Sequence, residues 1–107
     1  MEKIEKVTRW SQVAVLVSPS FGAGWYSWNT AHPELLFSPK IIWMVERNRS
    51  NQITEEWVKE NLGLSDIYCG GAKGLEIFWL PVGTRFKIKE DGGAESVQTL
   101  SDLVLVA

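Results

Sequence analysis

The fold is organised around residues 19–29, which read Pro-Ser-Phe-Gly-Ala-Gly-Trp-Tyr-Ser-Trp-Asn. Gly22 and Gly24 free the backbone here, while large aromatic rings crowd the same short span. Glycine is favoured where the chain must adopt a left-handed conformation or approach another group closely. Aromatic rings beside such a loop either fold back onto the core or form the wall of a pocket. The stretch therefore predicts either a turn that caps the core or a recognition loop, and the sequence leaves both open.

The segment before this loop is predicted to be extended. Residues 3–17 are rich in β-branched side chains, with valines alternating at the end of the segment, and a break is expected near Ser11. Pro19 ends the strand because proline has no N–H to donate to a sheet.

Two helices are predicted after the loop. The first has Ser38 as its N-cap and Pro39 at its first position, and it ends at the polar run 48–52. The second begins after the N-cap Thr54 and ends at Gly63, which has the position of a left-handed C-terminal residue. Ile53 and Val58 around its start have the spacing of a hydrophobic staple, which makes this the better-defined helix.

The chain then changes to the two-residue period of strands. Predicted strands are 67–69, 75–80, 85–90 and 95–100, with a hairpin turn at 91–93 and either a last strand or a packed tail at 103–106. Helices grouped in the middle and hairpins at the end predict an α+β fold, with two central helices packed on one face of a mostly antiparallel sheet.

Composition narrows the class of protein. A chain of 107 residues has room for one domain, residues 1–107, with one hydrophobic core. The net charge of −2 argues against a general nucleic-acid binder, and the chain has no stretch that predicts a signal peptide or a membrane span. The single cysteine, Cys69, excludes an internal disulfide and fits a reducing compartment, so we expect a cytoplasmic protein.

The sequence makes a poor case for an enzyme, and we expect no catalytic residue, metal or cofactor. Residues 22–27 resemble the dinucleotide motif G-x-G-x-x-G but lack its helix. No placed partner is evident for His32, and nothing in the sequence brings Cys69 and His32 together as a catalytic pair. The carboxylates Glu90, Asp91 and Glu95 flank a hairpin turn, where such groups are usually solvated. A hydrolase that uses His32 or these carboxylates is the weakest alternative.

The case for binding is better. Aromatic rings stack on flat ligands, glycine N–H groups can meet an anion, and an arginine can neutralise it. The residues expected at such a ligand site are Phe21, Gly22, Gly24, Trp25, Tyr26, Trp28, Asn29 and Arg85.

Three segments carry a resemblance to a protein family. Residues 21–29, 81–88 and 90–96 resemble small proteins encoded in phage and prophage genomes, with a Gly-Ala-Gly-Trp-x-Thr-Trp-Asn-like segment, a Val-Pro-x-Gly strand and an Asp-Gly-Ala-Glu-Ser turn. The chain departs from this pattern by Ser27 in place of threonine and by the second glycine of the pair 92–93. The resemblance implies a phage-type accessory protein, of the kind that counters host defence, and it carries over no functional residues.

Two hypotheses of function follow. In the first, the protein is a non-catalytic homo-oligomer in the host cytosol that captures a small nucleotide-like anion, for example to sequester a host immune signal. In the second, the same aromatic loop binds a host or virion protein, with Trp25 and Trp28 as its energetic centre.

Overall fold

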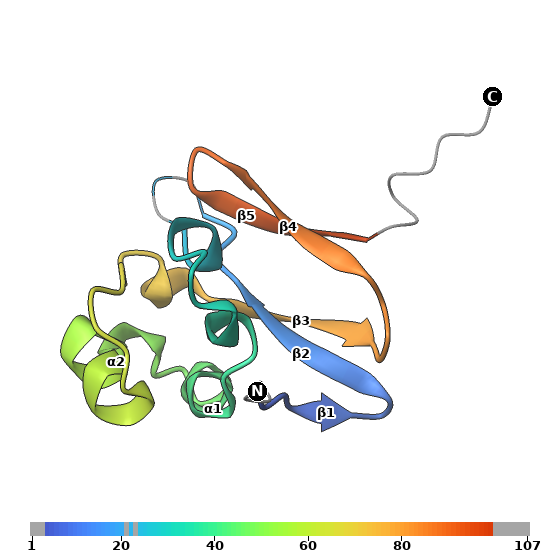
Figure 1. Cartoon of the computed structure of the whole chain (residues 1–107), viewed down its shortest axis with the longest axis horizontal. Coiled ribbons are helices and arrows are strands. Elements are labelled where there is room, and N and C mark those ends of the chain that lie inside the picture. The colour runs from blue at the N-terminus through green and yellow to red at the C-terminus, as the bar shows by residue number, and fades with distance from the viewer. Residues whose placement is uncertain (1–3, 21, 23, 100–107) are drawn as a thin grey trace.

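A computed structural model describes residues 4–20, 22 and 24–99 of the chain (Figure 1). The strands in this part are β1 (Thr8–Arg9), β2 (Gln12–Val17), β3 (Glu76–Pro81), β4 (Phe86–Asp91) and β5 (Ala94–Thr99). The α-helices are α1 (Pro39–Glu46) and α2 (Glu55–Leu62). Short 3₁₀ helices are η1 (Tyr26–Trp28), η2 (Pro33–Leu36), η3 (Ser50–Gln52) and η4 (Ala72–Gly74). None of the helices in these ranges is long and apolar enough to cross a membrane.

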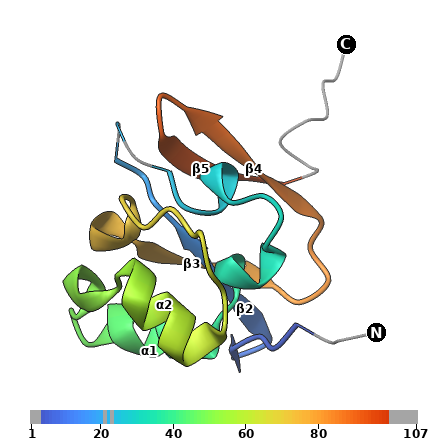
Figure 2. The ribbon, with the colours of Figure 1, turned by 60° about the vertical axis from the view of Figure 1, so that its left-hand side comes forward.

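The strands form two antiparallel sheets, which confirms the predicted α+β class. One sheet has the order β1-β2-β3, and the other is the β4–β5 hairpin. In Figures 1 and 2 the hairpin lies away from α1 and α2, with β2 and β3 between them. The helices therefore cover one face of the three-stranded sheet, and the hairpin covers part of the other.

The two faces of β2 explain this layered arrangement. Ala14 and Leu16 pack into the cluster that holds the apolar residues of α1 and α2, such as Ile42 and Val58. Val15, on the opposite face, packs into the cluster that the hairpin covers. Because successive side chains of a strand point to opposite faces, a strand buried on both sides reads as a continuous apolar run, as β2 does.

Both helices begin as the sequence predicts. The Ser38 hydroxyl accepts a hydrogen bond from the N–H of Ile41, and the Thr54 hydroxyl accepts one from the N–H of Trp57. Helix α2 ends at Gly63 in the left-handed conformation, with φ of 70°. These caps satisfy backbone groups that a helix end would otherwise leave without partners.

Both hairpin turns use left-handed backbone. The predicted break near Ser11 is a turn between β1 and β2, in which Trp10 and Ser11 have φ of 54° and 62°. The predicted turn between β4 and β5 has Gly92 and Gly93 at φ of 59° and 91°. Positive φ at both central residues matches the twist of a two-residue hairpin, and glycine adopts it without the strain that Trp10 carries.

One predicted strand is absent. Residues 67–69 lie in the described chain without strand structure. The backbone of Tyr68, the middle residue, is instead bonded to the Asn29 side chain, as described below. The predicted strand or tail at 103–106 lies outside the described residues, as does Leu100, the last residue of the predicted strand 95–100.

Candidate functional site: an aromatic pair held by a buried carboxylate

A buried carboxylate anchors the loop that the sequence singled out. Glu95 in β5 is only 3% exposed. Its Oε1 atom accepts a hydrogen bond from the N–H of Ser18 at 2.9 Å. Its Oε2 atom accepts bonds from the N–H groups of Trp25 and Ser27, each at 2.8 Å, and from the Ser27 hydroxyl at 2.6 Å. The prediction of solvated carboxylates at this hairpin is therefore wrong for Glu95.

The location of these donors explains why the carboxylate can be buried. Trp25 is the N-cap residue of η1, and Ser27 lies within its single turn. The first N–H groups of a helix have no partners within it and favour a negative charge nearby. Glu95 thus acts as a capping group supplied by a strand far along the chain. Its own N–H donates to the Ser18 carbonyl at 2.8 Å, which ties the same strand to the end of β2.

The Asn29 side chain also forms hydrogen bonds to backbone groups of the loop and of Tyr68. Its side-chain N–H₂ donates to the carbonyls of Trp25 at 2.8 Å and Tyr68 at 3.0 Å. Its side-chain oxygen accepts the N–H of Tyr68 at 2.9 Å. The amide therefore takes both backbone groups of Tyr68, as a neighbouring strand would, so this residue is hydrogen-bonded without a strand partner.

Trp25 is part of the core. Its ring is fully buried, and the indole N–H donates to the carbonyl of Leu35 at 2.9 Å. Trp25 has no exposed surface on which a ligand could stack. The sequence leaves open whether the loop caps the core or recognises a ligand, and Trp25 caps the core.

Trp28 and Tyr68 form the exposed part of the site. The two residues are 41% and 42% exposed, and their ring centroids lie 4.9 Å apart with the planes tilted by 47°. A Cβ atom added at Gly24 would lie 2.8 Å from the Trp28 ring, and one added at Gly70 would overlap the Tyr68 ring. Glycines at these two positions therefore leave the space that the rings occupy. We call Trp28 and Tyr68 the aromatic pair.

Of the other predicted ligand residues, Gly24 and Asn29 adjoin this pair, whereas Gly22 and Arg85 lie apart from each other. Gly22 donates its N–H to the Gly92 carbonyl at 2.7 Å, which uses the group expected to meet an anion. Arg85 is exposed just before β4, whereas Gly92 lies just after it. A six-residue strand separates them by roughly 20 Å. Tyr26 is half-buried against both core clusters, and Phe21 lies outside the described residues.

His32 and Cys69 have separate partners in the described structure. The Nδ1 atom of His32 lies 3.2 Å from a carboxylate oxygen of Glu34. The thiol of Cys69 donates to the carbonyl of Ile67 at 3.6 Å. Burial, with a smaller contribution from the charge of Glu55, raises the pKa of this thiol to about 11. A thiol that stays protonated at neutral pH is a poor nucleophile.

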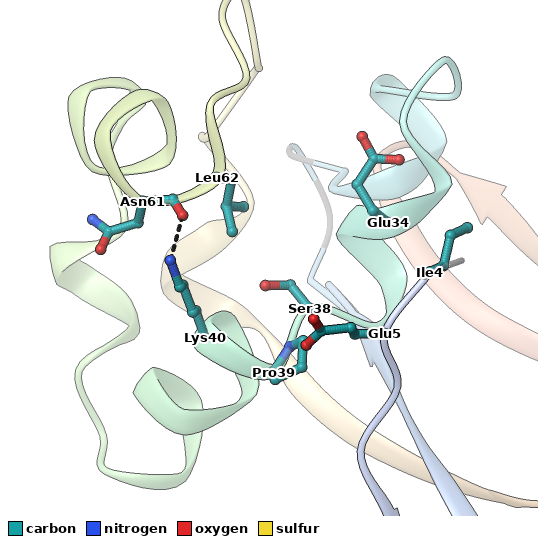
Figure 3. Close-up of a pocket in the computed structure, with 8 residues that line it drawn as sticks. All are labelled: Ile4, Glu5, Glu34, Ser38, Pro39, Lys40, Asn61 and Leu62. Atoms are coloured by element: carbon teal, nitrogen blue, oxygen red, sulfur yellow. Dashed lines mark hydrogen bonds between the residues drawn. The ribbon is translucent and has the colours of Figure 1, made fainter. Parts of the chain in front are cut away.

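The hollow drawn in Figure 3 lies elsewhere, between the N-terminal segment, η2 and the two helices. It has a volume of about 260 Å³. Its lining includes two carboxylates, Glu5 and Glu34, and one cation, Lys40, whose ammonium group donates to the Asn61 carbonyl at 2.7 Å. Two carboxylates and a cation already in use do not suit an anionic ligand.

Sequence reasoning missed Glu95 and Tyr68 as parts of the site. Glu95 has no local signal, because its partners lie about seventy residues earlier in the chain. Tyr68, Cys69 and Gly70 have a sequence typical of a strand end. The signal for Tyr68 is the glycine two residues after it, which is consistent with a ring folded over the backbone.

Comparisons with protein-family models, with curated proteins and with solved structures give no match to this chain.

Proposed function

We propose that the protein is a non-catalytic protein-binding domain whose aromatic pair, Trp28 and Tyr68, is the centre of the contact. The observation that carries this proposal is the pair itself, two residues that are each about two-fifths exposed, with touching rings, on a backbone held by part-buried hydrogen bonds. Trp and Tyr are enriched among the residues that dominate binding energy at protein interfaces.

Rigid presentation supports a role in binding. Trp28 lies between two residues that are held by hydrogen bonds. The N–H and hydroxyl of Ser27 both bond to Glu95, and the side chain of Asn29 bonds to the Tyr68 backbone. A backbone held in place before binding loses little conformational entropy when a partner covers the side chains that it carries. The polar residues of the loop thus support the aromatic pair and leave its rings for the contact.

The first hypothesis, a small nucleotide-like anion, has less support. The N–H of Gly22 and the side chain of Asn29 are used within the fold, and Arg85 lies at the far end of the hairpin. The two rings also cover part of each other, which leaves less of either face for stacking on a base. Because of the resemblance to small phage proteins, the partner that we propose is a host or virion protein, bound in the cytoplasm.

The experiment is a comparison of partners captured by the wild-type chain and by matched variants. Trp28→Ala and Tyr68→Ala remove the aromatic pair, and Trp43→Ala removes a ring of similar exposure, 44%, on α1. With a captured partner purified, we expect Trp28→Ala to weaken its binding by about 30-fold, corresponding to roughly 2 kcal/mol. Trp43→Ala should bind like the wild type.

Two outcomes would contradict the proposal. One is a partner that binds Trp28→Ala and the wild-type chain equally. The other is a nucleotide that raises the melting temperature of the wild-type chain but not that of Trp28→Ala, which would restore the small-ligand hypothesis at the same residues. Circular dichroism of each variant confirms that the fold is kept.

A further inference from the structure

We propose that the outer edge of β3 pairs with the β3 of a second copy of this chain, joining two three-stranded sheets into one. In the described part of the chain, β3 is the last strand of the order β1-β2-β3, and its only strand neighbour is β2. An edge strand presents unpaired N–H and C=O groups that can bond to another strand.

The side chains of β3 make this edge unusually open to pairing. Its sequence is Glu-Ile-Phe-Trp-Leu-Pro, so apolar residues fill its centre, and its charge and its proline lie at the two ends. Proteins commonly protect edge strands by charged side chains within the strand, by proline or by short length. The central four residues of β3 have none of these protections.

The other edges in the described structure are better protected. β1 has only two residues, and its Arg9 is held in an ion pair with Glu46 of α1. β4 carries Lys87 and Lys89 at alternate positions, with Glu90 and Asp91 at its end. β5, the second edge of the hairpin, has no run of exposed apolar residues, and the N–H of its Glu95 already bonds to the Ser18 carbonyl. β3 is therefore the edge whose apolar centre is left without protection.

Phe78 lies at the middle of the exposed surface of β3. It is 46% exposed and pairs with Val15 of β2, so it lies on the sheet face that the hairpin covers elsewhere. Val15 and Leu80 on that face are buried under hairpin residues, but Phe78 is left in solvent. A ring of this size half-exposed on an open edge is a natural point of contact with another chain.

The sequence of β3 is suited to antiparallel pairing with itself. A two-fold axis through Phe78 places this residue opposite Phe78 of the second copy, and places Ile77 opposite Trp79 on the other face. Aromatic pairs and pairs of aromatic with β-branched residues are among the more stabilising cross-strand combinations. A closed two-fold contact of this kind gives a dimer and leaves no further copy of the same edge exposed. A second copy is therefore the occupant that fits both the backbone edge and its side chains.

Sedimentation velocity or light scattering of the whole chain over a range of concentrations tests this inference. We expect a monomer–dimer equilibrium for the wild type. Phe78→Lys places like charges opposite each other and should weaken dimerisation by about tenfold or more. Val82→Lys is the matched control, because Val82 is 61% exposed but lies beyond the end of β3, and it should dimerise like the wild type.

A disulfide test checks the register. In a Cys69→Ala background, Phe78→Cys should form an intermolecular disulfide on mild oxidation, because residues directly opposite in an antiparallel pair lie within disulfide reach. Val82→Cys should not. A wild-type chain that stays monomeric, a dimer that Phe78→Lys leaves intact, or cross-linking through Val82→Cys alone would each overturn the proposal.

Discussion

Glu95 accepts a 2.8 Å hydrogen bond from the backbone N–H of Trp25, seventy residues earlier in the chain. This contact joins the start of the last described strand to the N-cap of η1. The indole of the same Trp25 is buried in the core that the helices share. A single carboxylate therefore connects the hairpin, the loop and the core, and the aromatic pair depends on all three.

Replacing this carboxylate tests its contribution to stability. Glu95→Gln keeps the size of the side chain but places an N–H₂ group among the N–H donors of Trp25, Ser27 and Ser18, so one or more of them loses its acceptor. We expect the free energy of unfolding to fall by about 2–4 kcal/mol, measured by chemical denaturation. Glu90→Gln is the control: Glu90 lies opposite Glu95 in the hairpin but is exposed, and the change should cost less than about 1 kcal/mol. Equal losses for the two variants would contradict the special role of Glu95.

Tryptophan fluorescence distinguishes the buried ring from the exposed ones. Trp25→Phe removes a buried indole and its hydrogen bond to Leu35, so we expect the free energy of unfolding to fall by about 2–3 kcal/mol. The fluorescence component that acrylamide quenches readily should remain. Trp28→Phe should remove part of the quenched component and cost less than about 1 kcal/mol. Trp10→Phe should remove the most readily quenched component, because Trp10 is 94% exposed at a hairpin turn. Strong quenching that disappears with Trp25→Phe would show that the loop is open.

The raised pKa of Cys69 predicts both reactivity and pH dependence. Because the pKa of the thiol is raised from 9.0 to about 11, alkylation by iodoacetamide should be slow at pH 8 and should accelerate toward pH 11. The contribution of this burial to stability is fully present below about pH 9, the pKa of the unfolded thiol, and is lost as the pH rises toward about 11. Cys69→Ala should show a flatter stability curve between these values. Alkylation at pH 8 as fast as in the urea-unfolded chain would contradict the burial.

The glycines beneath the aromatic pair differ in how freely a neighbouring side chain can move away from an added Cβ atom, so their alanine variants should differ in stability. An added Cβ at Gly24 would lie 2.7 Å from the Ser27 hydroxyl oxygen, which is bonded to Glu95 and has little freedom to move. Gly24→Ala should therefore lower the free energy of unfolding by about 1–3 kcal/mol.

At Gly70 the added atom would meet the far end of the Tyr68 ring, which can swing away. Gly70→Ala should therefore change the near-ultraviolet circular dichroism of the pair with a smaller loss of stability. Gly74→Ala is the control, because its added atom would have an ordinary 3.4 Å contact with Ser20. A Gly70→Ala spectrum identical to that of Gly74→Ala would show that Tyr68 does not lie over Gly70.

The sequence by itself determined the local elements of this protein. Ser38 and Thr54 cap their helices, Gly63 ends α2, and Gly92 and Gly93 form the hairpin turn, because each of these features depends on residues within one turn of the chain. The α+β class follows from the order of these elements. The run of apolar and β-branched residues before Pro19 predicts an extended, half- to fully buried strand, and the structure buries β2 on both faces.

Only the tertiary structure decided what the loop does. Whether Trp25 faces the core or solvent, and whether Glu95 is solvated or buried, depends on how β5 lies against the end of β2, and no local pattern encodes that contact. The tertiary structure also decided the conformation of residues 67–69. Their sequence is typical of a strand, but the backbone of Tyr68 bonds to the Asn29 amide. Short-range rules specify where a chain bends and caps, whereas the burial of a polar group is decided by donors that distant segments bring to it.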